Sequence, residues 1–122
     1  MTSIAIVGAS RDRKKFGNKA VRAYASKGYT VYPVNPNEKN IEGLKAYPSL
    51  SSLPQKPNIA SLYVPPQVGL KVADEIIKLG IRDIRINPGA ESHELVQKLE
   101  MAKLQPKLIC SLLAIGIDPG TL

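Results

Sequence analysis

Two kinds of hydrophobic pattern alternate along the chain. Short runs rich in Val and Ile are typical of strands buried on both faces of a parallel sheet. Segments whose apolar residues recur every three or four positions are typical of amphipathic helices. The runs predict strands at 4–7, 29–34, 59–64, 81–86 and 107–115, and the periodic segments predict helices at 16–27, 67–79 and 92–104.

The order of these segments predicts the fold class. Strand, helix, strand, strand, helix, strand, helix, strand is typical of a doubly wound α/β protein. We therefore expect one Rossmann-like domain over residues 1–122, with a mainly parallel sheet of about five strands and helices on both faces. Pro33 is expected near the end of its strand, because a proline nitrogen cannot donate to a neighbouring strand. The 81–86 run alternates apolar and charged residues, which favours a position nearer an edge.

Composition narrows the class of protein further. A length of 122 residues with 43% hydrophobic content suits one globular domain. The apolar runs are shorter than the roughly 20 residues of a membrane span, and the N-terminus does not resemble a secretory signal. Cys110 is the only cysteine and His93 the only histidine, so neither an internal disulfide nor a structural zinc site is expected. These features predict a cytoplasmic protein without a bound metal and without a membrane partner.

Charge adds a candidate site. The net charge of +7 favours an anionic partner. Five cations and one acid, Asp12, lie between Ser10 and Lys19, which gives a local charge of five minus one, or +4. This segment follows Gly8 and runs into a predicted helix, whose free N–H groups and dipole attract anions. The pattern predicts a phosphate-binding loop, and the alternative is a turn with solvated cations.

The common nucleotide motifs are not met. After Gly8, the dinucleotide pattern G-x-G-x-x-G would need glycines where Ser10 and Arg13 stand. The acidic residue that holds a ribose after the second strand is replaced by the run 34–36, Val-Asn-Pro. The Walker pattern G-x-x-x-x-G-K-[ST] is absent as well. The loop therefore indicates a phosphate site on a Rossmann-like scaffold that is neither a standard NAD site nor a standard ATP site.

Several motifs in order resemble one known family. The stretches "VGASRDRKKFGNKAVRAYASKGYTVYPVNPN", "YPSLSSLP", "LYVPP" and "NPGAES" are similar to those of the stand-alone CoA-binding proteins. These are small Rossmann-like proteins related to the nucleotide-binding domain of succinyl-CoA synthetase α subunits. The resemblance covers about residues 4–110. It implies that coenzyme A or an acyl-CoA is the small-molecule ligand, and it implies no catalytic machinery.

The resemblance also implies which residues contact the coenzyme, from its diphosphate to its thiol. The diphosphate would be cradled by Gly8, Ala9, Ser10 and Arg11. The phosphorylated ribose would be covered by Lys14, Lys15, Phe16 and Gly17, and the adenosine bordered by Asn35 and Pro36. The pantetheine arm would run along Val64, Pro65 and Pro66, and the far rim would be shaped by Pro88, Gly89 and Ala90.

The tail departs from the family's pattern. Relatives usually have a short polar ending after the cysteine, whereas this chain continues "SLLAIGIDPGTL" after Cys110. This departure leaves the last strand and the role of Cys110 open. We expect Cys110 to be a buried, small apolar residue. The alternative is that it faces the CoA thiol and forms a mixed disulfide.

Residues for catalysis are not convincing. His93 is expected to be exposed near a helix start, and Glu91 and Glu94 are ordinary partners of a helix dipole. The sequence therefore predicts a non-catalytic CoA-binding module rather than an enzyme. Two alternatives stay open: an NAD(P)-linked, oxidoreductase-like nucleotide-binding protein, and a basic nucleic-acid-binding protein. The missing ribose acid counts against NAD, and the scarcity of aromatic residues for base stacking counts against nucleic acid.

Overall fold

A parallel five-stranded sheet forms the centre of the molecule, whose computed structural model describes residues 2–122. The strand order is β2-β1-β5-β6-β7, and every neighbouring pair is parallel. The strands are β1 (Ser3–Val7), β2 (Thr30–Val34), β5 (Ile59–Leu62), β6 (Asp83–Ile86) and β7 (Lys107–Leu108). A short antiparallel pair, β3 (Asn40–Ile41) and β4 (Leu44–Lys45), lies outside this sheet. The predicted Rossmann-like, doubly wound fold is confirmed.

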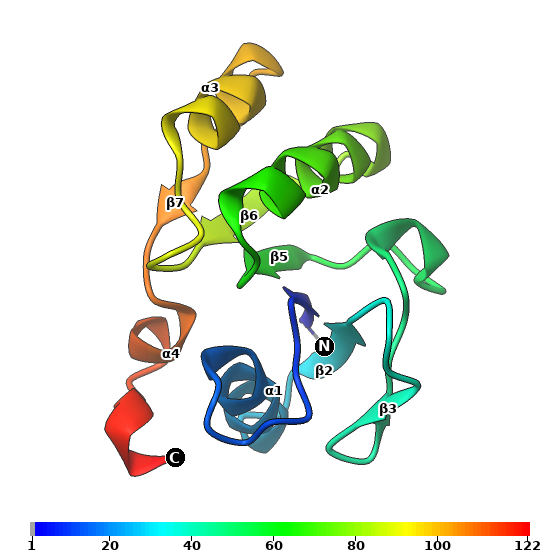
Figure 1. The fold of residues 1–122 in the computed structure, drawn as a ribbon, viewed down its shortest axis with the longest axis vertical. Helices are drawn as coiled ribbons and strands as arrows, with labels where there is room; N and C mark the ends of the chain where they lie inside the picture. Colours follow the sequence, from blue (N-terminus) through cyan, green and yellow to red (C-terminus); the bar gives the residue numbers. More distant parts are fainter. Residues whose placement is uncertain (1) are drawn as a thin grey trace.

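Helices cover both faces of the sheet (Figure 1). One face carries α1 (Phe16–Ser26) and α4 (Ser111–Ala114), and the other carries α2 (Pro66–Leu79) and α3 (His93–Met101). Two short 3-10 turns complete the chain, η1 (Leu50–Ser52) and η2 (Pro119–Thr121). None of the helices in residues 2–122 is long and apolar enough to cross a membrane.

The alternation of β1 side chains builds two cores. Ile4 and Ile6 pack with α1 and α4, whereas Ala5 and Val7 pack with α2 and α3. This is the pattern of a strand buried on both faces, since successive side chains of a strand point to opposite sides. The apolar run that predicted a central strand is therefore explained by the two helical layers.

Pro33 is accommodated because β2 is an edge strand. Its carbonyl accepts a hydrogen bond from the N–H of Tyr47 at 2.9 Å, on the side away from β1. Its nitrogen faces that same outer side, so no donor to β1 is lost. The alternating strand β6 lies next to the short edge strand β7, which agrees with its expected place near an edge.

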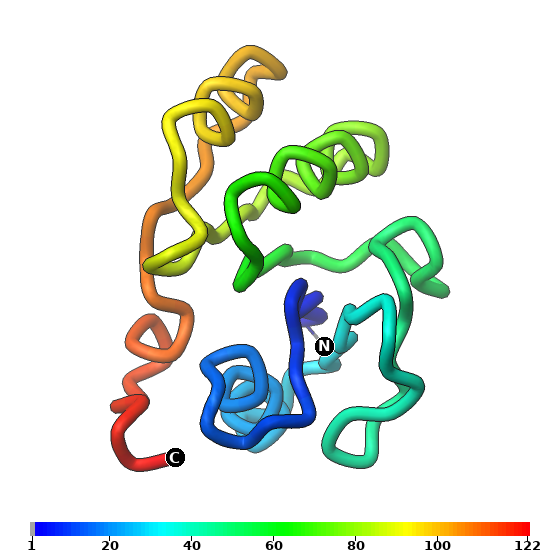
Figure 2. The backbone as a smooth tube through the Cα atoms, viewed as in Figure 1, coloured from blue at the N-terminus to red at the C-terminus, as the bar shows by residue number. Residues whose placement is uncertain are grey.

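The last predicted strand, 107–115, is wrong over most of its length. Only Lys107–Leu108 pairs with β6, and Ser111–Ala114 is helix α4. Ser111 sets this conformation, because its N–H donates to Asn87 Oδ1 at 2.8 Å and its hydroxyl lies 2.7 Å from the Ser61 hydroxyl. Side chains of β5 and of the loop after β6 thus hold the chain away from the sheet. The tail then runs beside α1 to the C-terminus (Figure 2).

Candidate functional site

The strand order creates a crevice between the ends of β1 and β5. The chain leaves β1 toward the α1 face and leaves β5 toward the α2 face, so the two loops diverge at this point (Figure 1). In open α/β sheets, ligands bind at such a switch point, outside the carboxyl ends of the strands. Gly8 begins the loop after β1, and Tyr63 and Val64 begin the loop after β5.

Three adjoining cavities occupy this edge of the sheet, and Tyr63 lines all three. The β2-side cavity, of about 370 Å³, adds residues that include Ala9, Ser10, Asn35, Pro36, Pro48 and Lys71. The central cavity, of about 390 Å³, adds Gly17, Pro65, Pro66, Gly89 and Ala90. The tail-side cavity, of about 220 Å³, is lined by Phe16, Tyr63, Asn87, Pro88, Cys110, Leu113 and Pro119. Because neighbouring cavities share lining residues, they form one groove across the edge.

Gly8 is required for the close approach of the first loop to β5. Its φ is +92°, a conformation that L side chains rarely adopt. A Cβ there would lie 2.5 Å from the Tyr63 carbonyl oxygen and 2.9 Å from Val64 Cγ1. A Cβ at Gly17 would in turn overlap the Gly8 carbonyl oxygen. The two glycines therefore let the first loop lie between β5 and the start of α1.

Two asparagines hold this loop in place. The amide of Asn35 donates to the Ala9 carbonyl at 2.8 Å, and the buried Asn18 donates to the Ser10 carbonyl at 2.9 Å. The N–H groups of Gly8 and Ala9 both donate to the Val34 carbonyl. Sequence reasoning missed Asn18, because a polar residue in an amphipathic helix is ordinarily assigned to the solvent face. Its burial depends on the loop that folds over it.

The start of α1 favours an anion. Lys15 is the N-cap residue, no side chain caps the helix, and its first turn contains no acidic residue. Free N–H groups and the helix dipole therefore point toward the crevice. Lys15 lines the β2-side and central cavities, and Lys71 of α2 adds a second cation to the β2-side cavity.

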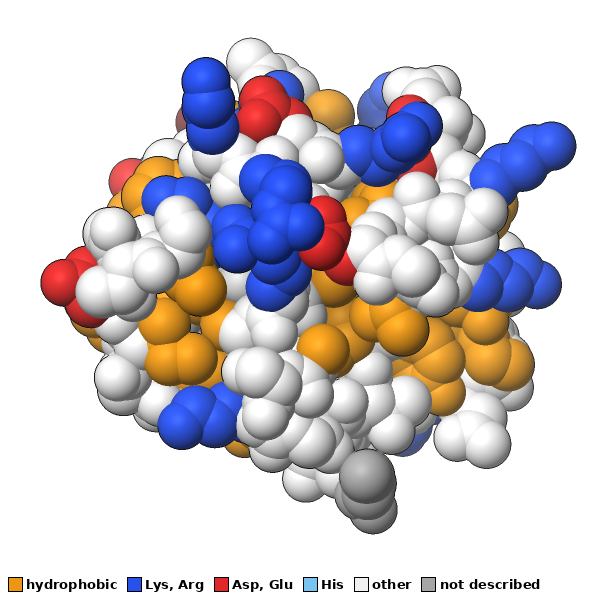
Figure 3. Space-filling view, turned by 90° about the horizontal axis from the view of Figure 1, so that it is seen from below, with side chains coloured by type: hydrophobic (Ala, Val, Ile, Leu, Met, Phe, Trp, Pro, Cys, Tyr) orange, Lys and Arg blue, Asp and Glu red, His pale blue; other side chains and the backbone are white. Residues whose placement is uncertain are grey.

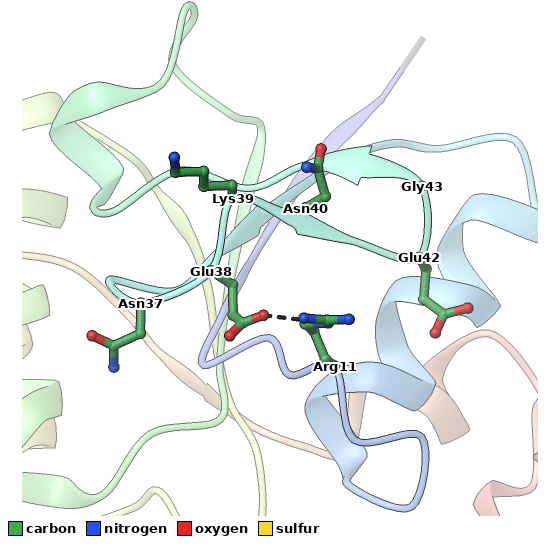
Figure 4. A pocket seen from close by; sticks show the side chains of 7 residues that line it. All are labelled: Arg11, Asn37, Glu38, Lys39, Asn40, Glu42 and Gly43. Carbon is green, nitrogen blue, oxygen red and sulfur yellow. Dashed lines mark ion pairs between the residues drawn. The ribbon is translucent and has the colours of Figure 1, made fainter.

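Two cations of the first loop are paired with acids that follow β2. Arg11 lies 3.4 Å from Glu38 and Arg13 lies 3.1 Å from Glu42. Figure 4 shows Arg11 in a separate cavity beside the β3–β4 turn, with its guanidinium directed at Glu38. Figure 3 views the molecule from below Figure 1. On this face, basic and acidic side chains lie next to one another. The local charge of +4 is thus partly balanced by residues distant in sequence.

The structure brings most of the predicted site residues together. Fourteen of the sixteen line at least one of the three cavities; the two that do not are Arg11 and Lys14. Lys14 is exposed, and its N–H donates to Asp12 Oδ1 at 3.0 Å. Phe16 lies at the central and tail-side cavities rather than at the β2 side. Ligand contact by all sixteen residues stays a prediction.

Tyr63 is the residue that sequence reasoning missed most clearly. It joins the three cavities, yet its place in the run "IASLYV" indicated only a strand residue. Its hydroxyl is buried and makes no hydrogen bond with the described residues, although the Ser61 and Ser111 hydroxyls lie near it. Burial raises the pKa of Tyr63, and the neighbouring Cys110 thiol raises it further. A buried donor without a partner costs free energy, so this hydroxyl is a local weakness of the core.

The tail forms the far end of the groove. Lys19 donates to the Pro119 carbonyl at 3.0 Å and lies 5.4 Å from the centre of the Phe16 ring. Cys110, expected to be buried, is instead partly exposed on the wall of the tail-side cavity. The reason is that α4 begins directly after it and leaves its side chain at the rim. His93 is exposed, as expected.

Comparison with known proteins identifies the family. A family model described as "CoA binding domain" matches residues 2–114. The chain belongs to this family. It is 35% identical over 94 residues to ADP-forming acetate–CoA ligase II of Archaeoglobus fulgidus, which covers 75% of this chain and 14% of that protein. It is 33% identical over 84 residues to the α subunit of an ADP-forming acetate–CoA ligase II from Pyrococcus furiosus, which covers 68% of this chain and 18% of that subunit. The chain therefore spans less than a fifth of the length of these curated relatives.

Solved structures share the fold. A conserved hypothetical protein from Pyrococcus furiosus superimposes with a TM-score of 0.85 at 40% identity, over 94% of this chain and 98% of that one. A dinucleotide-forming acetyl-coenzyme A synthetase from Ca. Korarchaeum cryptofilum superimposes with a TM-score of 0.74 at 31% identity, over 86% of this chain and 25% of that one. The fold thus occurs in a protein of about this length and in part of a larger synthetase.

Proposed function

We propose that this chain binds coenzyme A in the groove at the carboxyl edge of its sheet and acts as a binding module without catalysis. The observation that carries the proposal is the continuity of the groove through Tyr63, from the phosphate-type loop at Gly8 to the apolar end near the tail. A molecule with phosphates at one end and a long neutral arm fits this gradient. The family match supports the same ligand.

The polar end of the groove suits the nucleotide. The uncapped N-terminus of α1 and the cations Lys15 and Lys71 would face the phosphates. Asn35 and Pro36 would border the adenosine, at the end of β2. NAD is less well suited to this site, since no acidic residue stands at the end of β2 to hold its ribose.

The middle of the groove suits the pantetheine arm. Val64, Pro65 and Pro66 form one wall of the central cavity, and Pro88, Gly89 and Ala90 form the other. These walls present mainly apolar surface, and the exposed backbone can bond to the amides of the arm. The thiol would then lie toward the tail-side cavity.

The lining of the groove supports a binding role. Glu75 is the only acid among the residues that line the three cavities, and Ser51 holds its carboxylate through its N–H at 2.9 Å and its hydroxyl at 2.7 Å. Among these described residues, Cys110 has no adjacent histidine or carboxylate to activate it. We therefore expect no release of thiol from acetyl-CoA above the blank. Turnover that disappears in His93→Ala would contradict the binding-module assignment.

Ligand identity can be tested directly. Native mass spectrometry of the gently purified protein is expected to show a retained mass of CoA or of an acyl-CoA. Calorimetry is expected to give affinities in the order CoA, dephospho-CoA, NAD, with no binding of a short single-stranded DNA. NAD or DNA binding tighter than CoA would overturn the proposed function.

A further inference from the structure

The tail-side cavity is an uncharged end of the groove. Its seven lining residues include Phe16, Pro88 and Leu113, and none of the seven carries a charged side chain. This contrasts with the β2-side cavity, which contains Lys15, Lys71 and Glu75. Free CoA ends at its sulfur atom. It would therefore leave this cavity, which lies beyond the expected position of the thiol, unfilled.

The tail builds this cavity through specific contacts. Tyr24 of α1 donates to the Ser111 carbonyl at 2.6 Å, and Lys19 donates to the Pro119 carbonyl at 3.0 Å. These bonds bring Leu113 and Pro119 to the same cavity as Phe16. Pro119 lies beyond residues 2–114, where the family match ends. The cavity therefore depends on a part of this chain that the family pattern does not describe.

We propose that the tail-side cavity holds the acyl group of an acyl-CoA with a short, uncharged chain of about four carbons. The proposal rests on the proposed function, since it places the thioester of a bound coenzyme at the junction between the central and tail-side cavities. Phe16, Tyr63 and Pro88 line both cavities and form that junction.

The size of the cavity sets the length of the acyl group. A cavity of about 150 Å³ with apolar walls takes up benzene, which has six carbons. The tail-side cavity, of about 220 Å³, therefore has room for a butyryl group. Each methylene buried there is expected to tighten binding by about fourfold.

Because no charged side chain lines the cavity, we expect the acyl group that it holds to be uncharged. Lys19 is bonded to Pro119 and lies against the Phe16 ring, outside the lining residues. A carboxylate at the end of the acyl group would lie against uncharged, mainly apolar side chains and lose part of its hydration, which is unfavourable. Succinyl-CoA, which has four acyl carbons and a terminal carboxylate, is therefore expected to bind more weakly than butyryl-CoA.

Calorimetry with four ligands tests the proposal, in a reducing buffer that keeps Cys110 a free thiol. The ligands are CoA, acetyl-CoA, butyryl-CoA and succinyl-CoA. Butyryl-CoA has two more methylenes than acetyl-CoA and is expected to bind about 15-fold more tightly than acetyl-CoA and at least tenfold more tightly than succinyl-CoA. Equal affinities for acetyl-CoA and butyryl-CoA, or a preference for succinyl-CoA, would overturn the proposal. Failure of all four ligands to bind would instead contradict the proposed function.

A pair of variants locates the acyl group. Leu113→Asp adds a carboxylate to the cavity wall at a side chain that is 63% exposed, so the fold is expected to tolerate it. Met101→Asp is the matched control, because Met101 is 79% exposed at the end of α3 and lines none of the three cavities. Leu113→Asp should remove most of the preference for butyryl-CoA over acetyl-CoA, and Met101→Asp should keep it. A preference that survives Leu113→Asp would place the acyl group elsewhere and refute the proposal.

Discussion

The Tyr24 hydroxyl donates to the backbone carbonyl of Ser111 at 2.6 Å, a bond that joins two residues 87 positions apart. Tyr24 is fully buried in α1, and Arg85 of β6 donates to the same hydroxyl at 2.9 Å. Through Ser111 the bond connects to Asn87 and Ser61, so the first helix, the sheet and the tail share one polar network. This network holds α4 at the end of the groove, where a strand was predicted.

Tyr24→Phe is expected to lower the free energy of unfolding by about 2 kcal/mol. The ring stays in the core, but the Ser111 carbonyl and the Arg85 guanidinium each lose a buried partner. Chemical denaturation measures the change. Tyr47→Phe is the control, because Tyr47 is only partly buried and packs through its ring, and it should change stability by less than about 0.5 kcal/mol. An equal decrease in the free energy of unfolding in both variants would show that the Tyr24 hydroxyl does not anchor the tail.

Stability is expected to fall as the pH rises above about 10. Burial raises the pKa of both Tyr24 and Tyr63, partly offset at Tyr24 by Arg85. Below pH 10 both tyrosines are protonated in the folded and the unfolded chain, so they add no pH dependence. Above it, the unfolded chain releases protons that the folded chain keeps, and each group lowers stability by about 1.4 kcal/mol per pH unit up to its folded pKa.

Denaturation curves between pH 8.5 and 11 check this linkage. Tyr63→Phe removes one of the two groups, so its stability should fall less steeply with pH than that of the wild type. All other ionisable groups are the same in the two proteins, so the difference between their slopes reports on Tyr63. The same slope in Tyr63→Phe and wild type would show that the Tyr63 hydroxyl ionises as readily in the folded chain as in the unfolded one.

Gly8→Ala is expected to destabilise the protein by about 3 kcal/mol or more. The new Cβ would meet the Tyr63 carbonyl oxygen at 2.5 Å, in addition to the strain of a φ of +92°. Gly89→Ala is a matched control, since Gly89 has a similar φ of +95° but no atom within 4 Å of its added Cβ. It should cost only about 1–2 kcal/mol. Similar costs measured by urea denaturation would mean that the loop after β1 can move away from β5.

From the sequence, Gly8→Val is expected to harm binding more than folding, because Gly8 borders a phosphate site. The structure changes that expectation. The nearest atoms to an added side chain belong to the backbone of Tyr63 and to Val64, which cannot easily shift. A loss of binding in any Gly8 variant therefore has to be compared with its loss of stability before it is assigned to the ligand.

Lys15→Ala is expected to weaken CoA binding by about tenfold. Lys15 lines two of the cavities at the start of α1, and a charged hydrogen bond contributes roughly 1.5–3 kcal/mol. Calorimetry at two salt concentrations should show a smaller loss at the higher one, because salt screens the interaction. Lys27→Ala is the control, since Lys27 is exposed at the opposite end of the same helix. A Lys27→Ala effect as large as that of Lys15→Ala would indicate only a general effect of net charge.

Glu38→Gln is expected to strengthen CoA binding by up to about fivefold. Arg11 is 74% exposed and lies 3.4 Å from Glu38, so the pair is weak and readily opened. Without the carboxylate, Arg11 is free to reach the diphosphate, its implied partner. Unchanged affinity in Glu38→Gln, together with unchanged affinity in Arg11→Ala, would exclude Arg11 from the binding site.

The sequence by itself determined the parallel sheet, its two helical layers and which residues the main loops carry to the edge of the sheet. The reason is that strands such as β1 and helices such as α1 carry their burial pattern in a short stretch of chain. The glycine at position 8, the cations after it and the Val-Pro-Pro loop are also local features. They line one edge because the carboxyl ends of parallel strands all meet there.

Only the tertiary structure decided which distant groups meet. Arg11 pairs with Glu38, Tyr63 joins the three cavities, and Ser111 turns the tail into α4 by bonding to Asn87. The apolar tail has a pattern that fits a strand or a short helix, and hydrogen bonds from other elements decide between them. Such contacts join residues separated by tens of positions, so no periodicity within a single segment records them.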